Sequence, residues 1–417
     1  MNALKIFVLM SVVLLSDFYF IDPSIRLQTL AMALLIAMHM RNHGMPRFTL
    51  LTGNRLSRLM GVSAWFIAYM SFIDFIRGVS LYEVGVKLLS YVLIIFLLPA
   101  FVERNKPFSM VIWYRRFLLI SIAFAAMQVS GLHYALGDIV PNIGIIGSNL
   151  AREELIDTYG RVTGATYNTI AFSMQMVILI LLVYGGFLAQ PRKDRIHYGI
   201  LGILGLLLSQ TRAALIGLIP AIVISYLIFA NSRLQSAMKL VPMLTLALGM
   251  AWVMQNLASD YFPYLAKEID ESDTHRFWTN WYMTLGVLNE SPLFGISPEQ
   301  AWDVYFRHAD RNAVVQYTPE MKTPTHHNQL GYYLRYYGLI GIFFLMSVYY
   351  QVLKLINSST SMPMRIFLGS VIILDFLYSM THNNKLLVSP LLWIFLSLAL
   401  LPIEKANRTL TSATRGV

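Results

Sequence analysis

The chain is dominated by apolar segments that are each long enough to cross a bilayer core of roughly 30 Å. Hydrophobic residues make up 56% of its 417 residues and charged residues only 13%, which is too apolar for an ordinary soluble domain. The sequence therefore predicts an all-α polytopic membrane protein in which residues 1–417 form a single transmembrane domain. We expect about twelve spans, at approximately 3–21, 24–41, 59–76, 82–102, 113–131, 166–189, 196–210, 212–230, 237–256, 330–353, 364–380 and 386–402.

The distribution of positive charge predicts the orientation of these spans. More than half of the 32 Lys and Arg residues fall on one side if both termini share that side. Because Lys and Arg gather in cytoplasmic loops, we expect both termini to be cytoplasmic. The net charge of +10 is explained in this way and does not indicate nucleic acid binding. The absence of cysteine excludes a disulfide framework, a thiolate metal site and a cysteine nucleophile.

The loop over residues 257–329, between the ninth and tenth spans, lies outside and is too long to be a mere connector. Apolar residues recur at four-residue spacing over Asp273–Asn289, which predicts a helix with Asp273 as its N-cap. Pro298 suits the first turn of a second helix over Glu299–Asp310. We expect this loop to form a small periplasmic helical cap on the outer end of the bundle.

The segment Ile196–Ala230 is almost continuously apolar, and as one helix it would be about 50 Å long, too long for one span. We therefore expect a hairpin that turns at Ser209–Arg212, below the outer surface because its first arm is short. Arg212 is a functional candidate, since a guanidinium inside the membrane is costly unless it is paired and its donors match phosphate geometry. The alternative is an interfacial anchor that extends toward water. Three glycines on the first arm predict close packing: Gly199, Gly202 and Gly205.

Two adjacent histidines, His326 and His327, stand where the long loop meets a helix that begins at Gln329. A histidine there can exchange a proton near neutral pH, or it can be part of a polar collar that ends a span. Gly338 and Gly341 lie on one face of this helix, where we expect a neighbouring helix to approach closely.

Further basic groups are expected on the outer side, and each is either an anchor or part of an anion site. Arg77, Lys87 and Arg161 belong to this group, and Arg276 lies in the predicted loop helix, where Asp273 can pair with it. We see no ligand set for a hard cation and no carboxylate pair inside the membrane. The chemistry indicated is the binding of a negatively charged, lipid-borne group and the movement of a proton without a metal. A polyprenyl diphosphate sugar fits this description.

Four motifs, in this order along the chain, resemble those of bacterial O-antigen ligases, members of the O-antigen ligase and polymerase superfamily. Gly160–Asn168 resembles the segment before the sixth span, and Ser209-Gln-Thr-Arg-Ala213 resembles the family's arginine hairpin. Asp273–Tyr282 with Ser291-Pro-Leu-Phe-Gly295 resembles the loop helix that carries a second arginine. His327-Asn328, followed after nine residues by Gly338-Leu-Ile-Gly341, resembles the histidine motif.

The resemblance implies a GT-C-like glycosyltransferase of the bacterial inner membrane that uses neither metal nor cofactor. It would transfer O-antigen from undecaprenyl diphosphate to lipid A–core oligosaccharide on the periplasmic face, with inversion at the anomeric carbon. His327 matches the family's histidine and would be the general base, while Arg212 and Arg276 would hold the charge of the leaving diphosphate. Substrate contacts are expected from Arg161, Lys87, Gln210, His326 and Asn328.

Other functions remain open at this point. An O-antigen polymerase uses another lipid-linked glycan as acceptor, and an oligosaccharyltransferase acts on protein. A transporter or flippase for lipid-linked glycans is a different class, in which inverted repeats and broken helices near the midplane are usual. We see no repeat, and the candidate residues gather at one face, which favours an enzyme.

Overall fold

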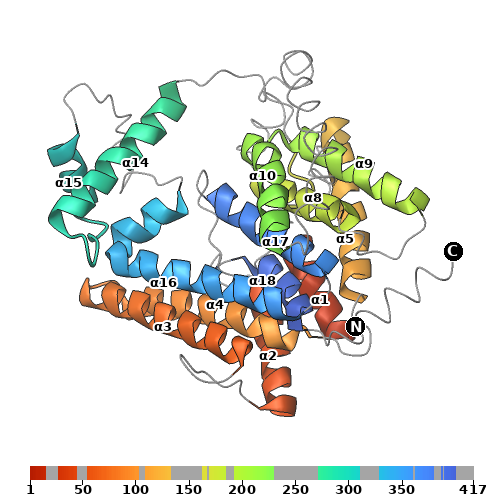
Figure 1. The fold of residues 1–417 in the computed structure, drawn as a ribbon, viewed down its shortest axis with the longest axis horizontal. Coiled ribbons are helices and arrows are strands. Elements are labelled where there is room, and N and C mark those ends of the chain that lie inside the picture. The colour runs from red at the N-terminus through yellow and green to blue at the C-terminus, as the bar shows by residue number, and fades with distance from the viewer. Residues whose placement is uncertain are drawn as a thin grey trace.

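The computed structural model describes residues 1–15, 27–44, 54–102, 109–132, 162–166, 169–184, 192–229, 271–309, 328–359, 362–379, 387 and 389–400. Every regular element in these residues is a helix (Figure 1). The helices are α1 (Ala3–Val13), α2 (Leu27–His43), α3 (Arg55–Ile76), α4 (Leu81–Ala100), α5 (Ser109–Val129), α8 (Thr169–Tyr184), α9 (Arg192–Ser209), α10 (Arg212–Phe229), α14 (Glu271–Glu290), α15 (Ala301–His308), α16 (Gln329–Ser359), α17 (Met362–Ser379), α18 (Pro390–Leu396) and the 3₁₀ helix η3 (Ser397–Leu400).

The predicted all-α polytopic architecture is confirmed. Every predicted span overlaps a helix except 237–256, which lies outside the described residues. Five helices, α3, α4, α5, α16 and α17, are long and apolar enough to cross a membrane, and the remaining apolar helices are shorter. The number of spans therefore stays a prediction.

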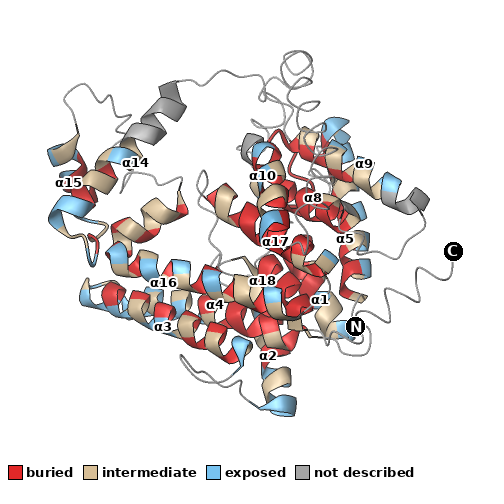
Figure 2. Ribbon diagram, in the orientation of Figure 1, coloured by how far each residue is buried: buried red, intermediate tan, exposed pale blue. Residues whose placement is uncertain are grey.

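The helices pack in groups around one apolar core. α3 lies against both α4 and α16, α10 lies along α17, and α8 lies along α9 (Figure 1). Buried residues line the inward faces of these helices (Figure 2). Large apolar side chains such as Trp65, Phe72, Ile216 and Phe343 are exposed on the outward faces, as a membrane-facing surface requires.

The predicted turn between α9 and α10 is confirmed and lies at residues 209–211. The two helices do not form a tightly packed hairpin, because α9 lies along α8 and α10 lies along α17. The predicted close packing on α9 is confirmed as well, and its partner is α8. A Cβ atom added to Gly202 would lie 2.8 Å from Ile180 Cγ1, and one added to Gly205 would lie 2.5 Å from Met176 Sδ.

The two predicted loop helices are present as α14 and α15, with shifted starts. α14 begins before Asp273, so this residue lies in the first turn and the predicted N-cap is wrong. α15 begins at Ala301, after a turn that contains Pro298. A small core of its own joins the two helices: Met283, Val287, Ile296, Ala301, Val304 and Tyr305.

An ion-pair network closes this unit. Glu290, at the end of α14, accepts hydrogen bonds from Arg307 Nε at 3.0 Å and Nη2 at 2.5 Å, and pairs with His308 Nε2 at 3.0 Å. The hydrogen bond from Arg307 is the main cause that holds the pKa of Glu290 below its usual value. Arg307 and His308 belong to the last turn of α15, so the network ties the C-terminal ends of α14 and α15 together.

Helix α16 is broken at Gly338, which has φ 63° and ψ −163°. The segment 329–337 folds back along the segment that follows, so that Tyr349 Oη donates to Gln329 Oε1 at 3.1 Å. Gly341 packs against Tyr333 and Tyr337 of the folded-back segment. The prediction of one continuous span with Gly338 on a packing face is therefore wrong, because this glycine is the turn itself.

The break leaves three carbonyl groups, those of residues 335–337, without their helical partners. The peptide N–H of Ile296 donates to the carbonyl of residue 335 at 2.7 Å. Arg77 Nη1 donates to the carbonyl of residue 336, and Tyr69 Oη donates to that of residue 337 at 2.7 Å. Arg77 Nη2 also donates to the carbonyl of Phe294 at 2.8 Å. Because an unpaired backbone group is costly in a membrane, these donors make the break tolerable.

The peptide N–H groups beyond the break are paired with the same loop. Leu339 N donates to Pro292 O at 2.8 Å, and Ile340 N donates to Leu293 O at 3.3 Å. The Ser291–Gly295 motif is thus docked on α16 through backbone hydrogen bonds. It occupies the place that the next helical turn would otherwise fill.

We expect Gly338→Ala to destabilise the protein. The combination of φ and ψ at this position is essentially restricted to glycine, and a Cβ atom would collide with Leu293 O. The strain alone amounts to about 1–3 kcal/mol. Thermal unfolding in detergent measures the effect.

The matched control is Gly85→Ala in α4, where nothing lies within 4 Å of an added Cβ atom. Because glycine inside a helix is less stable than alanine by about 0.5–1 kcal/mol, this change is expected to be neutral or stabilising. Equal unfolding temperatures for the two variants would show that the break at Gly338 is not required.

Candidate functional site

The helix start that follows the two histidines is well defined. Asn328 caps α16: its Oδ1 accepts from Gly331 N at 3.0 Å, and its carbonyl accepts from Tyr332 N at 2.9 Å. The predicted residues His326 and His327 lie outside the described residues, directly before this cap. The structure therefore describes the point at which His327 joins the bundle.

A buried polar network holds this helix start. Gln329 is fully buried, and Tyr349 Oη lies 3.1 Å from its Oε1 and 3.1 Å from Oδ2 of Asp375 in α17. Asp375 is also fully buried. Because buried polar groups are costly without hydrogen bonds, this network fixes Gln329 against α17. A hydroxyl has one hydrogen, so Tyr349 shares it between two acceptors unless Asp375 carries a proton and itself donates.

Sequence reasoning missed Asp375. The signal was available, since a lone aspartate inside an otherwise apolar span is a functional candidate by default.

The same stretch of α17 also contacts α10. A Cβ atom added to Gly217 would lie 3.0 Å from Cδ1 of Leu374, the neighbour of Asp375. Arg212 begins α10, about 7.5 Å along the helix axis from Gly217, and its side chain lies outside the described residues. α17 is therefore the common neighbour of the helix that follows His327 and of the helix that starts at Arg212.

A third segment lies beside the α9–α10 turn. Val162 N donates to Leu208 O at 3.2 Å, so Arg161, which precedes it and lies outside the described residues, joins the chain next to this turn. Gln210, a predicted substrate contact, is 2% exposed and has φ 49°, a left-handed conformation that is uncommon for a residue other than glycine.

Gln128 of α5 anchors this third segment. Its Oε1 accepts from Thr163 N at 2.9 Å and from Gly164 N at 3.0 Å, and its Nε2 donates to Thr163 Oγ1 at 2.9 Å. Gln128 and Thr163 are buried, and Gly164 packs closely against Phe172. Sequence reasoning missed Gln128, since a lone glutamine in a span has no motif.

Lys87, predicted to bind substrate, is part of a cluster that joins three helices. Its Nζ donates to Oδ2 of Asp74 at 2.5 Å and to the hydroxyl of Tyr337. Tyr337 Oη also donates to Asp74 Oδ1 at 3.1 Å. In this arrangement Lys87 supports the folded-back segment of α16. Its contact with a substrate stays a prediction.

Two further expectations concern Arg276 and the absence of a metal site. Arg276 lies in the first half of α14, its side chain lies outside the described residues, and its position relative to Arg212 stays a prediction. Among the described residues, no three His, Asp or Glu side chains gather in a way that could hold a metal ion.

Residues 197–346 match the family model described as O-antigen ligase. The matched range includes the α9–α10 turn, α14, α15 and the break in α16. A search among curated proteins found no match.

We expect Lys87→Met to lower the stability of the protein by about 1.5–3 kcal/mol, the range for a hydrogen bond to a charged group. The change leaves Asp74, whose side chain is 12% exposed, without its cation. Thermal unfolding of the purified protein is the measurement.

The double variant Lys87→Met/Asp74→Asn is the control, because it removes both charges and is expected to recover most of the loss. If Lys87→Met unfolds like the parent protein, Lys87 has no supporting role and only the substrate-binding prediction is left for it.

Proposed function

We propose, from the membership of this chain in the O-antigen ligase/polymerase superfamily, that it is an O-antigen ligase. The enzyme transfers O-antigen polysaccharide from undecaprenyl diphosphate to lipid A–core oligosaccharide. The reaction takes place on the periplasmic face of the bacterial inner membrane. The resemblance found in the sequence is confirmed at the level of the superfamily, and the donor, the acceptor and the orientation are parts of the proposal.

One observation carries the proposal beyond the family match. The helices that start at Arg212 and after His327 are far apart in sequence, yet both contact α17. Gly217, five residues after Arg212, packs on Leu374, and Gln329, two residues after His327, is linked through Tyr349 to Asp375. A catalytic base and a diphosphate-binding arginine have to be close together, because they act on opposite sides of the same anomeric carbon. The packing around α17 supports such an arrangement.

The proposed chemistry is a single displacement. The acceptor hydroxyl attacks the anomeric carbon as the bond from that carbon to the diphosphate oxygen breaks, and the electron pair leaves with the diphosphate. His327 takes the proton of the hydroxyl as general base. Arg212 and Arg276 stabilise the charge that develops on the diphosphate. One direct attack inverts the configuration of the anomeric carbon, and neither a metal nor a cofactor takes part.

The break in α16 bears on the transporter alternative, because broken helices are usual in transporters near the midplane. Here the break touches the outer loop and the C-terminal end of α3, through Leu293 and Arg77. It therefore lies at one end of the bundle, where it positions the helix start after His327. This placement favours an enzyme over a transporter.

The decisive experiment separates the ligase from its nearest rivals. Purified protein receives lipid-linked O-antigen together with lipid A–core, with no added acceptor, or with an acceptor protein. We expect glycan on lipid A–core in the first reaction only. Longer lipid-linked chains without an added acceptor would identify a polymerase, and glycan on the protein would identify an oligosaccharyltransferase.

We expect His327→Gln to lower the rate of transfer by at least about a hundredfold, since general-base catalysis contributes typically 10²–10⁴-fold. Glutamine keeps a polar side chain but cannot accept a proton near neutral pH. Binding of the lipid diphosphate donor, measured on the same preparation, should survive.

The matched control is His326→Gln, which changes the adjacent residue in the same way and is expected to have a smaller effect. A near-normal rate for His327→Gln, or a larger loss for His326→Gln, would make the assignment of the base wrong.

A further inference from the structure

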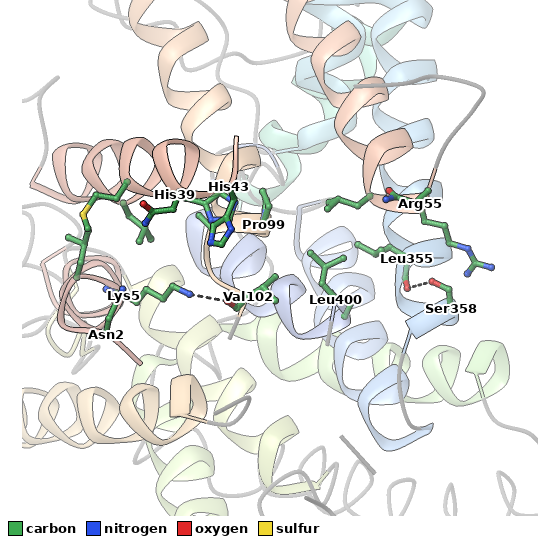
Figure 3. A pocket seen from close by; sticks show the side chains of 18 residues that line it. Asn2, Lys5, His39, His43, Arg55, Pro99, Val102, Leu355, Ser358 and Leu400 are labelled. Carbon is green, nitrogen blue, oxygen red and sulfur yellow. Dashed lines mark hydrogen bonds between the residues drawn. The ribbon is translucent and has the colours of Figure 1, made fainter. Parts of the chain in front are cut away.

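A cavity of about 980 Å³ (Figure 3) is lined by residues from the end of the bundle that lies opposite to α14 and α15 in Figure 1. The ends of α1, α2, α3, α4 and α16 meet around it. α3 begins at this cavity with Arg55 and ends next to Arg77, which binds the break in α16. Its 22 residues span about 33 Å, so the cavity lies far from the break, and its lining shares no residue with the candidate site. The distribution of basic residues predicts that it faces the cytoplasm.

Cationic and imidazole side chains from three helices line the cavity. Lys5 comes from α1, His39 and His43 come from α2, and Arg55 comes from α3. The two imidazole rings are 4.8 Å apart. Arg55 lies on the other side in Figure 3, with its guanidinium directed away from the histidines, and its Nη1 donates to the carbonyl of Lys354 at 2.9 Å. Lys5 Nζ donates to the carbonyl of Val102 at 3.0 Å, which holds the ammonium at the wall. Among the described residues that line the cavity there is no Asp or Glu.

Two helix starts bring side-chain amides to this cavity. Asn2 Oδ1 caps α1 by accepting from Lys5 N at 3.0 Å, and Asn54 Oδ1 caps α3 by accepting from Ser57 N at 2.8 Å. Both asparagines line the cavity, but so do the C-terminal ends of α2, α4 and α16, so the helix dipoles add no net positive potential and the positive charge comes from the side chains. Since each amide oxygen serves the helix, the group that each asparagine offers to a ligand is its NH₂ donor. The lining therefore suits an anion.

An apolar track leads out of the cavity along α2. Met38 lines the cavity, and Leu34 and Leu30 follow on the same face at four-residue spacing. These side chains are 45%, 55% and 48% exposed, so they face the surroundings of the bundle rather than its core. A soluble phosphate would make no use of this track, whereas the acyl chain of a lipid would lie along it.

We propose that this cavity binds the phosphodiester headgroup of an anionic glycerophospholipid of the inner leaflet, with one acyl chain along Leu30, Leu34 and Met38. Basic pockets between transmembrane helices on the cytoplasmic side are known to bind anionic headgroups. The cavity volume lies within the range of small-molecule sites. The lipid holds together the ends of α1, α2 and α3 and takes no part in the transfer reaction.

The test uses the full chain, purified in detergent, depleted of lipid and examined by native mass spectrometry and thermal unfolding. The probes are phosphatidylglycerol and phosphatidylcholine with the same acyl chains, inorganic phosphate and glycerol 3-phosphate. We expect phosphatidylglycerol to be retained and to raise the unfolding temperature at concentrations at least about fivefold lower than phosphatidylcholine, the ratio that corresponds to about 1 kcal/mol. Equal retention of phosphatidylcholine, or equal stabilisation by the two soluble phosphates, would overturn the proposal.

Variants locate the site. Lys5→Met is expected to weaken phosphatidylglycerol retention by about fivefold, since one Lys or Arg near an anionic membrane surface contributes about 1 kcal/mol. His39→Gln/His43→Gln, which replaces both imidazole rings of the lining, is expected to weaken retention as well. Arg116→Gln is the control, because this cation lies over the ring of Trp113 in α5, outside the cavity lining. Equal effects of Lys5→Met and Arg116→Gln would mean that only overall charge is sensed, which contradicts the proposal.

Leu34→Ser tests the acyl track without disturbing the cavity or the core. Leu34 is exposed and does not line the cavity, so this variant is expected to fold normally even if Lys5→Met does not. We expect it to weaken retention of phosphatidylglycerol while leaving the lipid-free unfolding temperature unchanged. Unchanged retention would overturn the assignment of the acyl chain. These experiments measure lipid retention and unfolding temperature and not glycan transfer. The lipid-binding proposal can therefore be disproved while the proposed function stands.

Discussion

Within a bilayer there is no water to pair with backbone groups, and this constraint governs the part of the molecule around the break in α16. Breaking α16 at Gly338 frees carbonyl and N–H groups that only other parts of the chain can pair. The loop motif Ser291–Gly295 and the side chains of Tyr69 and Arg77 supply what is missing. The loop and the broken helix therefore form one structural unit, although the sequence presents them as a soluble insertion and a membrane span.

The folded-back segment determines where the candidate site lies. A straight α16 would carry Asn328 outward, whereas the fold-back places it at the level of Tyr349 and Asp375 in the bundle interior. α17 then contacts both this helix start and α10. In the site that we propose, proximity would result from packing against this shared helix, and the polar network of Gln329, Tyr349 and Asp375 gives that packing a defined register.

Much of the fold could be predicted from apolar periodicity, because each span carries its own signal. The turn between α9 and α10 could be predicted for a similar reason, since an uninterrupted helix would be too long. The ion pair of Lys87 with Asp74 and the hydrogen bonds between Gln128 and Thr163 could not be predicted. Each depends on a partner far away in sequence, which neither spacing nor composition reveals. The prediction for Gly338 was wrong for a related reason. In the sequence, a glycine that turns the chain cannot be told from a glycine that lets two helices pack closely, and only the contact with Leu293 separates the two.

The docking of the loop on α16 through backbone groups has a consequence for how this protein can diverge. Peptide hydrogen bonds do not depend on which side chains flank them, so Leu293, Phe294, Leu339 and Ile340 are free to change while the joint between loop and helix is inherited intact. The exceptions are Gly295 and Gly338, where the two backbones touch and a side chain has no room. In a chimera between two such proteins, the loop and the helix are therefore interchangeable parts, provided that both parents have glycine at these two positions.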